Sequence, residues 1–239
     1  MMIIVGLVLG VLGSVAGGTQ AVVDDPRPVC AVIDGSAECP FPQPRTIDEA
    51  FLYLQSALAA VREAALAEPE LDASSATIIQ AQVNQLQDMF ATGSGPINPA
   101  YLEALHDVAT SVADAANEAD AEKANETLVL VRQDLDIKLA SSRAALGAGQ
   151  GRPNTIKVRI KPVRGRQVLS GYEVKCFKTL RQSTVGADCF LTNPDTTVEI
   201  MPGVYWVQIS RNGSVVYRDR IPIGRSQNDP TEITVPLPS

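Results

Sequence analysis

The chain has few of the side chains that most enzyme and metal sites need. Its 239 residues include a single histidine, His106, and four cysteines, and aromatic residues make up 5% of the composition. One histidine and four cysteines cannot build a multi-histidine metal centre. The net charge of −7 argues against a general nucleic-acid-binding protein, which would carry a basic surface. No calcium-loop motif is present, and no glycine-rich phosphate loop follows a predicted strand.

Charged side chains are also missing from the first 23 residues. An apolar core over 3–12 is followed by small residues, which is the pattern of a secretory signal peptide, placed here at 1–21. The positive charges that usually precede the core are missing. An uncleaved membrane anchor is therefore the alternative, because a span needs about 20 apolar residues and the uncharged segment is long enough. The sequence therefore predicts an exported protein, periplasmic or extracellular, with a membrane tether if the segment is retained.

The four cysteines form two local pairs, Cys30 with Cys39 and Cys176 with Cys189. Neither pair has the Cys-x2-Cys spacing of a zinc site, and no histidine lies near. Three pairings are possible, and the long separation between the pairs favours the two local disulfides. The first disulfide would pinch a proline-rich arm over 22–45, which we expect to be irregular.

Charge divides the remaining chain into two regions. Residues 24–151 contain 20 acidic and 7 basic side chains, whereas residues 152–239 contain 7 acidic and 13 basic ones. The glycine- and proline-rich segment 147–153 between them favours neither helix nor strand. We therefore expect two domains joined by this linker, and the opposite charges should attract the domains weakly at physiological ionic strength.

The first domain, over 46–146, has the apolar periodicity of α-helices. Thr46 and Glu49 form a capping-box signature. A seam with coiled-coil-like spacing follows it, formed by Ile47, Phe51, Leu54, Leu58, Val61 and Ala65. A second helix is expected to begin near Ser74, with Ile79, Val83, Leu86 and Phe90 on its seam. These seams either bind a partner as a coiled coil or bury one another in a small bundle, and amphipathic helices favour the bundle.

A third helix is expected after the Asn98-Pro99 pair, because proline at the first helical position lacks only an unused N–H donor. Neither glycine nor proline occurs again until Gly147. The apolar seam loses its register between Asn117 and Asn125. The segment is therefore either one long helix over 99–146 or two helices that meet near Asp120, and we expect the continuous or kinked helix.

The second domain, over 154–239, has the pattern of an antiparallel β-sandwich of about seven strands. Alternating apolar and basic residues predict a strand over 155–161. The Asn212-Gly213 pair between two apolar runs is a strong hairpin signal, because a type I′ turn needs positive φ at both central positions. The fold class is therefore α+β, with two domains, in which a helical hairpin or bundle precedes the sandwich.

One segment of the second domain resembles a known family. The run Val198-Glu-Ile-Met-Pro-Gly-Val-Tyr-Trp-Val207 is similar to the strand–Pro-Gly–strand segment of prealbumin-like sandwiches, of the PEGA and carboxypeptidase regulatory-like type. The literal Pro-Glu-Gly-Ala is absent. The resemblance implies a non-catalytic spacer or binding module and nothing more specific.

Candidate chemistry is sparse in both domains. His106 lies beside the apolar seam of its helix with Glu103 and Asp107 nearby, so we interpret it as a surface histidine that forms an ion pair. Tyr205 and Trp206 occupy a strand whose pattern looks like core. The strongest binding candidate is a basic group that could hold an anionic ligand, formed by Lys157, Arg159, Lys161, Arg164 and Arg166. An ordinary solvated strand face is the alternative.

The function that fits these features is that of an exported, non-enzymatic envelope protein. The helical region would contact a protein partner or support assembly, and the sandwich would serve as a binding or spacer module. The alternative is a hydrolase that brings two carboxylates together between the domains. No cofactor, no metal ion and no nucleic acid is expected.

Overall fold

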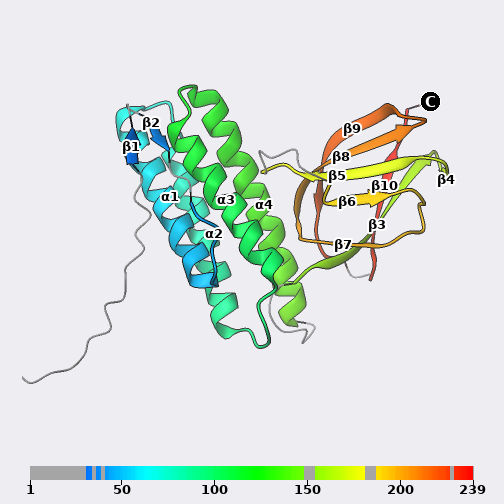
Figure 1. The fold of residues 1–239 in the computed structure, drawn as a ribbon, viewed down its shortest axis with the longest axis horizontal. Coiled ribbons are helices and arrows are strands. Elements are labelled where there is room, and N and C mark those ends of the chain that lie inside the picture. Colours follow the sequence, from blue (N-terminus) through cyan, green and yellow to red (C-terminus); the bar gives the residue numbers. More distant parts are fainter. Residues whose placement is uncertain are drawn as a thin grey trace, which may run out of the picture.

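The protein is α+β, with helices in its N-terminal half and strands in its C-terminal part, as predicted (Figure 1). The computed structural model describes residues 31–33, 36–38, 41–147, 154–180, 187–226 and 229–238. The predicted signal peptide, the predicted Cys30–Cys39 disulfide and most of the predicted linker lie outside the described residues. A helical bundle and a β-sandwich lie side by side, and helix α4 is the helix next to the sandwich.

The proline-rich arm is not irregular throughout. Strand β1 (Ala31–Ile33) pairs antiparallel with strand β2 (Ser36–Glu38). The sequence between the strands is Asp34-Gly35, a hairpin signal that the prediction of an irregular arm did not use.

Four helices form the bundle: α1 (Ile47–Ala67), α2 (Ala73–Thr92), α3 (Pro99–Asn117) and α4 (Ala121–Gly147). Helix α1 packs mainly against α3, and α2 packs mainly against α4. The predicted apolar seams meet in one core, whose members include Phe51, Leu54, Leu58, Ile79, Val83, Leu86, Leu105 and Val112. The bundle therefore buries its own seams.

The starts of the first two helices are capped by side chains. Thr46 caps α1 in a capping box, in which Thr46 Oγ1 accepts from the Glu49 backbone at 3.2 Å. Helix α2 begins slightly earlier than predicted because Asp72, and not a serine, is its N-cap. The Asp72 carboxylate accepts hydrogen bonds from the Ser74 backbone and from the hydroxyls of Ser74 and Ser75.

The expected continuous helix over 99–146 is wrong, and the chain breaks between Asn117 and Ala121. Glu118 leaves helical geometry with ψ at 124°. Asp120 then begins α4, since its Oδ1 atom accepts from the backbone N–H groups of Glu122 and Lys123. Aspartate favours this capping role over a helix-interior position, where its short side chain competes for backbone hydrogen bonds.

The sandwich has two sheets with a shared apolar core. The first contains β3 (Ile156–Arg164), β4 (Gln167–Val168), β7 (Val198–Ile200) and β10 (Thr231–Pro236). The second has the order β6-β5-β8-β9, formed by Cys189–Leu191, Glu173–Lys178, Gly203–Arg211 and Ser214–Ile223. The strand pairs are antiparallel except that β10 runs parallel to β3.

Two predicted local features of the second sheet are confirmed. Asn212 and Gly213 have φ values of 50° and 80°, so both central residues of the β8–β9 turn lie in the left-handed region. Cys176 and Cys189 form a disulfide between directly opposed positions of β5 and β6. This cross-link fastens the short edge strand β6 to its neighbour.

Candidate functional site

The predicted basic group lies mainly on the outer face of β3, where Glu232 neutralises part of it. Glu232 Oε1, on β10, lies 3.1 Å from Arg159 Nη1 and 2.9 Å from Lys161 Nζ. The hydrogen bond from Lys161 holds the pKa of the Glu232 carboxyl below its usual value. Two of the five predicted cations therefore bind an acid of the protein itself.

Lys157 shares the outer face of β3 with Arg159 and Lys161, as predicted, while Arg164 and Arg166 lie at the end of the strand. Lys157 is opposite Glu199 in the β3–β7 pair, and both line a shallow pocket of about 410 Å³ together with Asp229. Arg164 ends β3, and Arg166 lies in the turn that leads to β4. Acidic residues of the neighbouring strands, Glu199 on β7 and Glu232 on β10, lie beside the basic residues of β3, so this face is not uniformly basic.

His106 is less exposed than the sequence predicts, and it contacts the segment before α1. Its side chain is half-buried, and Nε2 donates a hydrogen bond to the Phe41 backbone carbonyl at 2.8 Å. Phe41 in turn stacks on Tyr53 with ring centroids 5.2 Å apart. The histidine therefore attaches the segment before α1 to α3, which is a structural role.

The bundle and the sandwich meet at a buried ion pair on α4. Asp134 and Lys138 lie one helical turn apart, and their side chains are 6% and 4% exposed. Asp134 Oδ1 accepts from the Val204 backbone N–H at 3.0 Å, and Lys138 Nζ donates to the Pro202 carbonyl at 3.0 Å. We call this arrangement of Asp134, Lys138 and the start of β8 the clasp.

Residue Gly203 lets the start of β8 approach the clasp. A Cβ atom at this position would overlap Asp134 Oδ1 and would lie 3.2 Å from Lys138 Nζ. The Pro-Gly pair of the segment that resembles prealbumin-like sandwiches thus has a local function here. It brings the backbone of the sandwich into contact with a helix of the bundle.

Further polar contacts surround the clasp. Lys178 Nζ on β5 lies 3.2 Å from Asp107 Oδ2 on α3, while burial of Asp107 raises the pKa of its carboxyl and Lys178 opposes that rise. Ser111 Oγ donates to the Leu180 carbonyl at 3.0 Å, and Ser141 Oγ accepts from the Arg225 backbone at 3.0 Å. Leu180 and Met201 of the sandwich complete the apolar core of the bundle.

The space between the clasp and the neighbouring pair of Asp107 and Lys178 is small. The cavity lined by Asp107, Asp134, Lys138 and Lys178 measures about 10 Å³. A cavity must hold about 10–15 Å³ for a single water molecule. Each carboxylate there is also matched with a lysine. The arrangement therefore suits structural docking, because it offers no room for a substrate.

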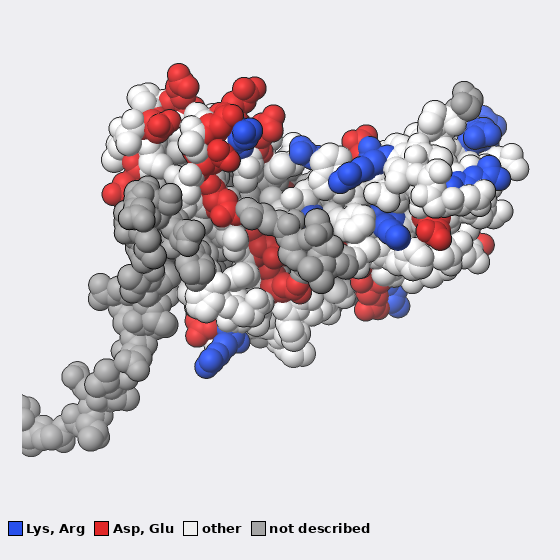
Figure 2. All heavy atoms as spheres, turned by 45° about the horizontal axis from the view of Figure 1, so that its top comes forward, with Lys and Arg blue, Asp and Glu red and all other residues white. Residues whose placement is uncertain are grey.

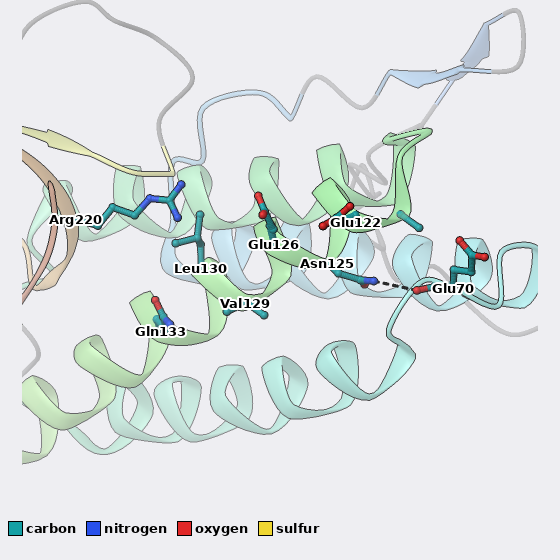
Figure 3. A pocket seen from close by; sticks show the side chains of 9 residues that line it. Glu70, Glu122, Asn125, Glu126, Val129, Leu130, Gln133 and Arg220 are labelled. Atoms are coloured by element: carbon teal, nitrogen blue, oxygen red, sulfur yellow. Dashed lines mark hydrogen bonds between the residues drawn. The ribbon is translucent and has the colours of Figure 1, made fainter. Parts of the chain in front are cut away.

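A wider groove lies where α4 faces the edge strand β9 (Figure 3). Its volume is about 580 Å³, and three of its lining residues are glutamates: Glu70, Glu122 and Glu126. Arg220 projects toward the groove from β9, and Asn125 Nδ2 donates to the Glu70 carbonyl at 2.9 Å. We call this the junction groove. Glu122 and Glu126 lie on one helix face, as the i, i+4 spacing requires.

Charge is divided between the two regions on the molecular surface. Figure 2 shows most of the acidic side chains gathered over the helical bundle and most of the visible lysines and arginines over the sandwich. The groove lies along this division, with glutamates on one wall and Arg220 on the other.

Strand β8 contributes to the sandwich core, as its pattern predicts, but Trp206 lies outside that core. Tyr205 is buried, but Trp206 is half-buried, because successive residues of β8 point to opposite faces. The guanidinium carbons of Arg218 and Arg220 lie 5.2 Å and 4.7 Å from the centroid of the Trp206 ring. The alternation in β8 and the Arg-x-Arg spacing in β9 were the sequence signals for this cluster.

No helix in the described part of the chain combines the length and apolar composition that a bilayer crossing needs. The same residues contain no group of three or more histidine, cysteine or acidic side chains placed to hold a metal ion. Comparison of the chain with protein-family models and with curated proteins finds no match.

Proposed function

We propose that this protein is an exported, non-enzymatic envelope protein that joins a protein partner to an anionic surface component. The uncharged segment 1–21 supports export. The Cys176–Cys189 disulfide supports it independently, because disulfides persist in oxidising compartments. The resemblance of 198–207 to prealbumin-like sandwiches supports a binding or spacer role for the sandwich.

The clasp is the observation that carries this proposal. Its buried ion pair bonds to the backbone of the sandwich, so an acidic bundle and a more basic sandwich are held as one body. A fixed arrangement of two unlike surfaces suits an adaptor. A hydrolase would need an open cleft with converging carboxylates. The carboxylates at the clasp, Asp107 and Asp134, are enclosed with lysines, which leaves the glutamates of the junction groove as the candidate for such a site.

The partner-binding surface of the bundle is proposed to be its outside, because the seams of the helices pack on one another. Several apolar side chains are exposed there. Leu66 is 87% exposed near the end of α1, and Val129 is 44% exposed at the junction groove. Apolar side chains that stay exposed on a folded surface are candidates for contact with another protein.

Site-specific photo-cross-linking in intact cells of the native host tests this proposal. A photoreactive residue would be placed at Leu66 or Val129 on the bundle, at Val216 on the sandwich, and at Gln167 on β4 as an exposed control. Captured molecules would be identified by mass spectrometry. We expect one recurrent envelope protein from the bundle positions and cell-surface material, without protein, from Val216.

Two results would contradict the proposal. Equal capture of unrelated proteins at all four positions would show that the bundle has no specific partner. Turnover of a substrate by the purified protein, abolished by E122Q/E126Q, would place a hydrolase site in the junction groove. Intact mass of the exported protein shows separately whether residues 1–21 are retained as a tether.

A further inference from the structure

The outer face of the β6-β5-β8-β9 sheet carries a cluster of cations that are held by aromatic rings. Arg218 and Arg220 flank Trp206, and Lys175 Nζ lies 5.5 Å from the centroid of the Phe190 ring. We call Lys175, Trp206, Arg218 and Arg220 the cationic face. Cation–π contacts of this kind fix the position of side chains that would otherwise be flexible.

A β-bulge in the β8–β9 hairpin is what brings both arginines to Trp206. Next to the turn, Ser210 pairs with Val215, but after the bulge Ile209 pairs with Tyr217, so β9 contains one extra residue. Trp206 consequently pairs with Arg220. Without the extra residue, Trp206 would face Asp219, and the arginines would point to the opposite side, since one residue of slippage reverses the faces of a strand.

Neither guanidinium group is taken up by an ion pair among the described residues, although Arg220 also borders the junction groove and its glutamates. Within the described part of the chain, neither the Arg218 nor the Arg220 side chain forms an ion pair or donates a hydrogen bond. Stacking on a ring occupies the flat face of a guanidinium and leaves its N–H edges free to bind a carboxylate bidentately. Arg159 and Lys161 on the other sheet are already bound to Glu232.

The cationic face extends across the sheet in a regular row. Lys175 is opposite Gln208, and Gln208 is opposite Arg218. Lys175 and Arg218 are therefore separated by two strand spacings, or about 10 Å. Gln208 between them can donate and accept hydrogen bonds, and the 54% exposed Phe190 offers a flat apolar surface beside Lys175.

We propose that the cationic face binds a carboxylated polysaccharide. Its arginine edges match carboxylates, Gln208 matches hydroxyl groups, and Phe190 matches the apolar face of a sugar ring. A row of cations that runs across a sheet face fits an extended chain with repeated charges better than it fits a single small anion. This inference rests on the proposed function, since it identifies the anionic component that the sandwich would bind.

Binding of the purified full chain to polygalacturonate, measured by isothermal titration calorimetry at physiological ionic strength, tests the inference. We expect R218Q/R220Q to weaken binding at least about tenfold, because two charge-assisted contacts are removed. The matched control R159Q/K161Q removes the same charge from the other sheet and should leave the affinity within about twofold, since those cations are bound to Glu232. R218K/R220K keeps the charge but loses the planar guanidinium, so its affinity for polygalacturonate should stay below that of the unmodified protein.

The remaining ligands distinguish a glycan site from other anion sites. Dextran tests for binding to neutral sugar, inorganic polyphosphate tests for general charge attraction, and phosphatidylglycerol vesicles test for a lipid surface. We expect all three to bind more weakly than polygalacturonate. Tighter binding of polyphosphate or vesicles would overturn the inference, as would equal losses in R218Q/R220Q and R159Q/K161Q.

Thermal unfolding of each variant shows whether it folds. A failure of the inference can also be told from a failure of the proposed function. If polygalacturonate does not bind but photo-cross-linking still captures an envelope partner, the glycan inference is wrong and the proposed function stands.

Discussion

Asp134 and Lys138 form a buried ion pair on α4, and both members also bind the backbone at the start of β8. Removing two charges from water costs several kcal/mol per ion unless further hydrogen bonds satisfy the donors and acceptors that the ion pair leaves free. Here those hydrogen bonds come from Pro202 and Val204, which belong to the sandwich. The pair is therefore satisfied only when the sandwich is docked on the bundle.

Substitution of one member of the pair should destabilise the whole protein. We expect Lys138→Met to cost about 3–5 kcal/mol, because Asp134 is left charged in a buried site. Denaturant unfolding measures the change. Lys123→Met is the matched control, since Lys123 pairs with the exposed Asp120 at the start of the same helix, and its loss should lower the stability far less than Lys138→Met does.

The double variant D134N/K138M removes both charges and should recover part of the stability that K138M loses. Equal effects of K138M and K123M would contradict a buried, satisfied pair. Denaturant unfolding of the three variants K138M, K123M and D134N/K138M gives both comparisons.

Substitution of Gly203 should lower the stability of the protein, even though the backbone conformation there does not require glycine. A methyl group in Gly203→Ala would overlap the Asp134 carboxylate, and relief of such overpacking typically costs about 1–3 kcal/mol. Gly147→Ala, with no atom within 4 Å of the added carbon, is the control. Thermal unfolding of both variants checks the prediction, and equal melting temperatures would show that β8 does not approach α4 this closely.

The helix seams, the helix starts and the β8–β9 hairpin could be predicted because local patterns determine them. Thr46 with Glu49, Asn98-Pro99 and Asn212-Gly213 each specify a local backbone geometry. The break between α3 and α4 is the alternative that the loss of seam register offers, and the absence of glycine and proline from this stretch wrongly favoured a continuous or kinked helix. Asp120 is the sequence signal for the break, because its side chain caps the start of α4.

Local patterns place Arg218 and Arg220 on one face of β9, but they do not show that Trp206 shares that face, and they give no signal for the clasp. The β8–β9 bulge decides which face Arg218 and Arg220 occupy, and hairpin register after a bulge does not follow from the turn residues alone. The clasp joins Asp134 to Val204, 70 positions away, so no local pattern connects them. Glu232 likewise reaches Arg159 and Lys161 only through the parallel pairing of β10 with β3.

The N-cap of α2 should make stability depend on acidic pH. Hydrogen bonds from Ser74 and Ser75 lower the pKa of Asp72 below its usual value of 3.8. The charged cap therefore stabilises the folded state above the unfolded-state pKa, and this contribution is lost as pH falls through the lower folded-state pKa.

Two variants separate the charge of Asp72 from its capping role. Asp72→Asn should keep most of the stability at neutral pH and flatten the acidic decline, because asparagine also caps well. Asp72→Ala should lose about 1 kcal/mol at neutral pH. Urea unfolding at a series of pH values measures both, and an unchanged acidic decline in Asp72→Asn would contradict this assignment.

The disulfide between β5 and β6 should contribute strongly to the stability of the sandwich. It joins residues 13 positions apart, and loops of about this length are stabilised by about 3 kcal/mol in the chain-entropy model. We expect C176A/C189A to lower the melting temperature while far-ultraviolet circular dichroism retains its helical signal. An unchanged melting temperature would show that β6 needs no cross-link.

Small-angle X-ray scattering across a salt series tests most directly whether bundle and sandwich form one body. Surface attraction between oppositely charged regions weakens with salt, but the contacts of a buried pair are screened much less. We therefore expect one compact profile, matching the docked arrangement, at both low and high salt, and a more extended profile for K138M. Expansion of the unmodified protein at high salt would contradict docking through the clasp.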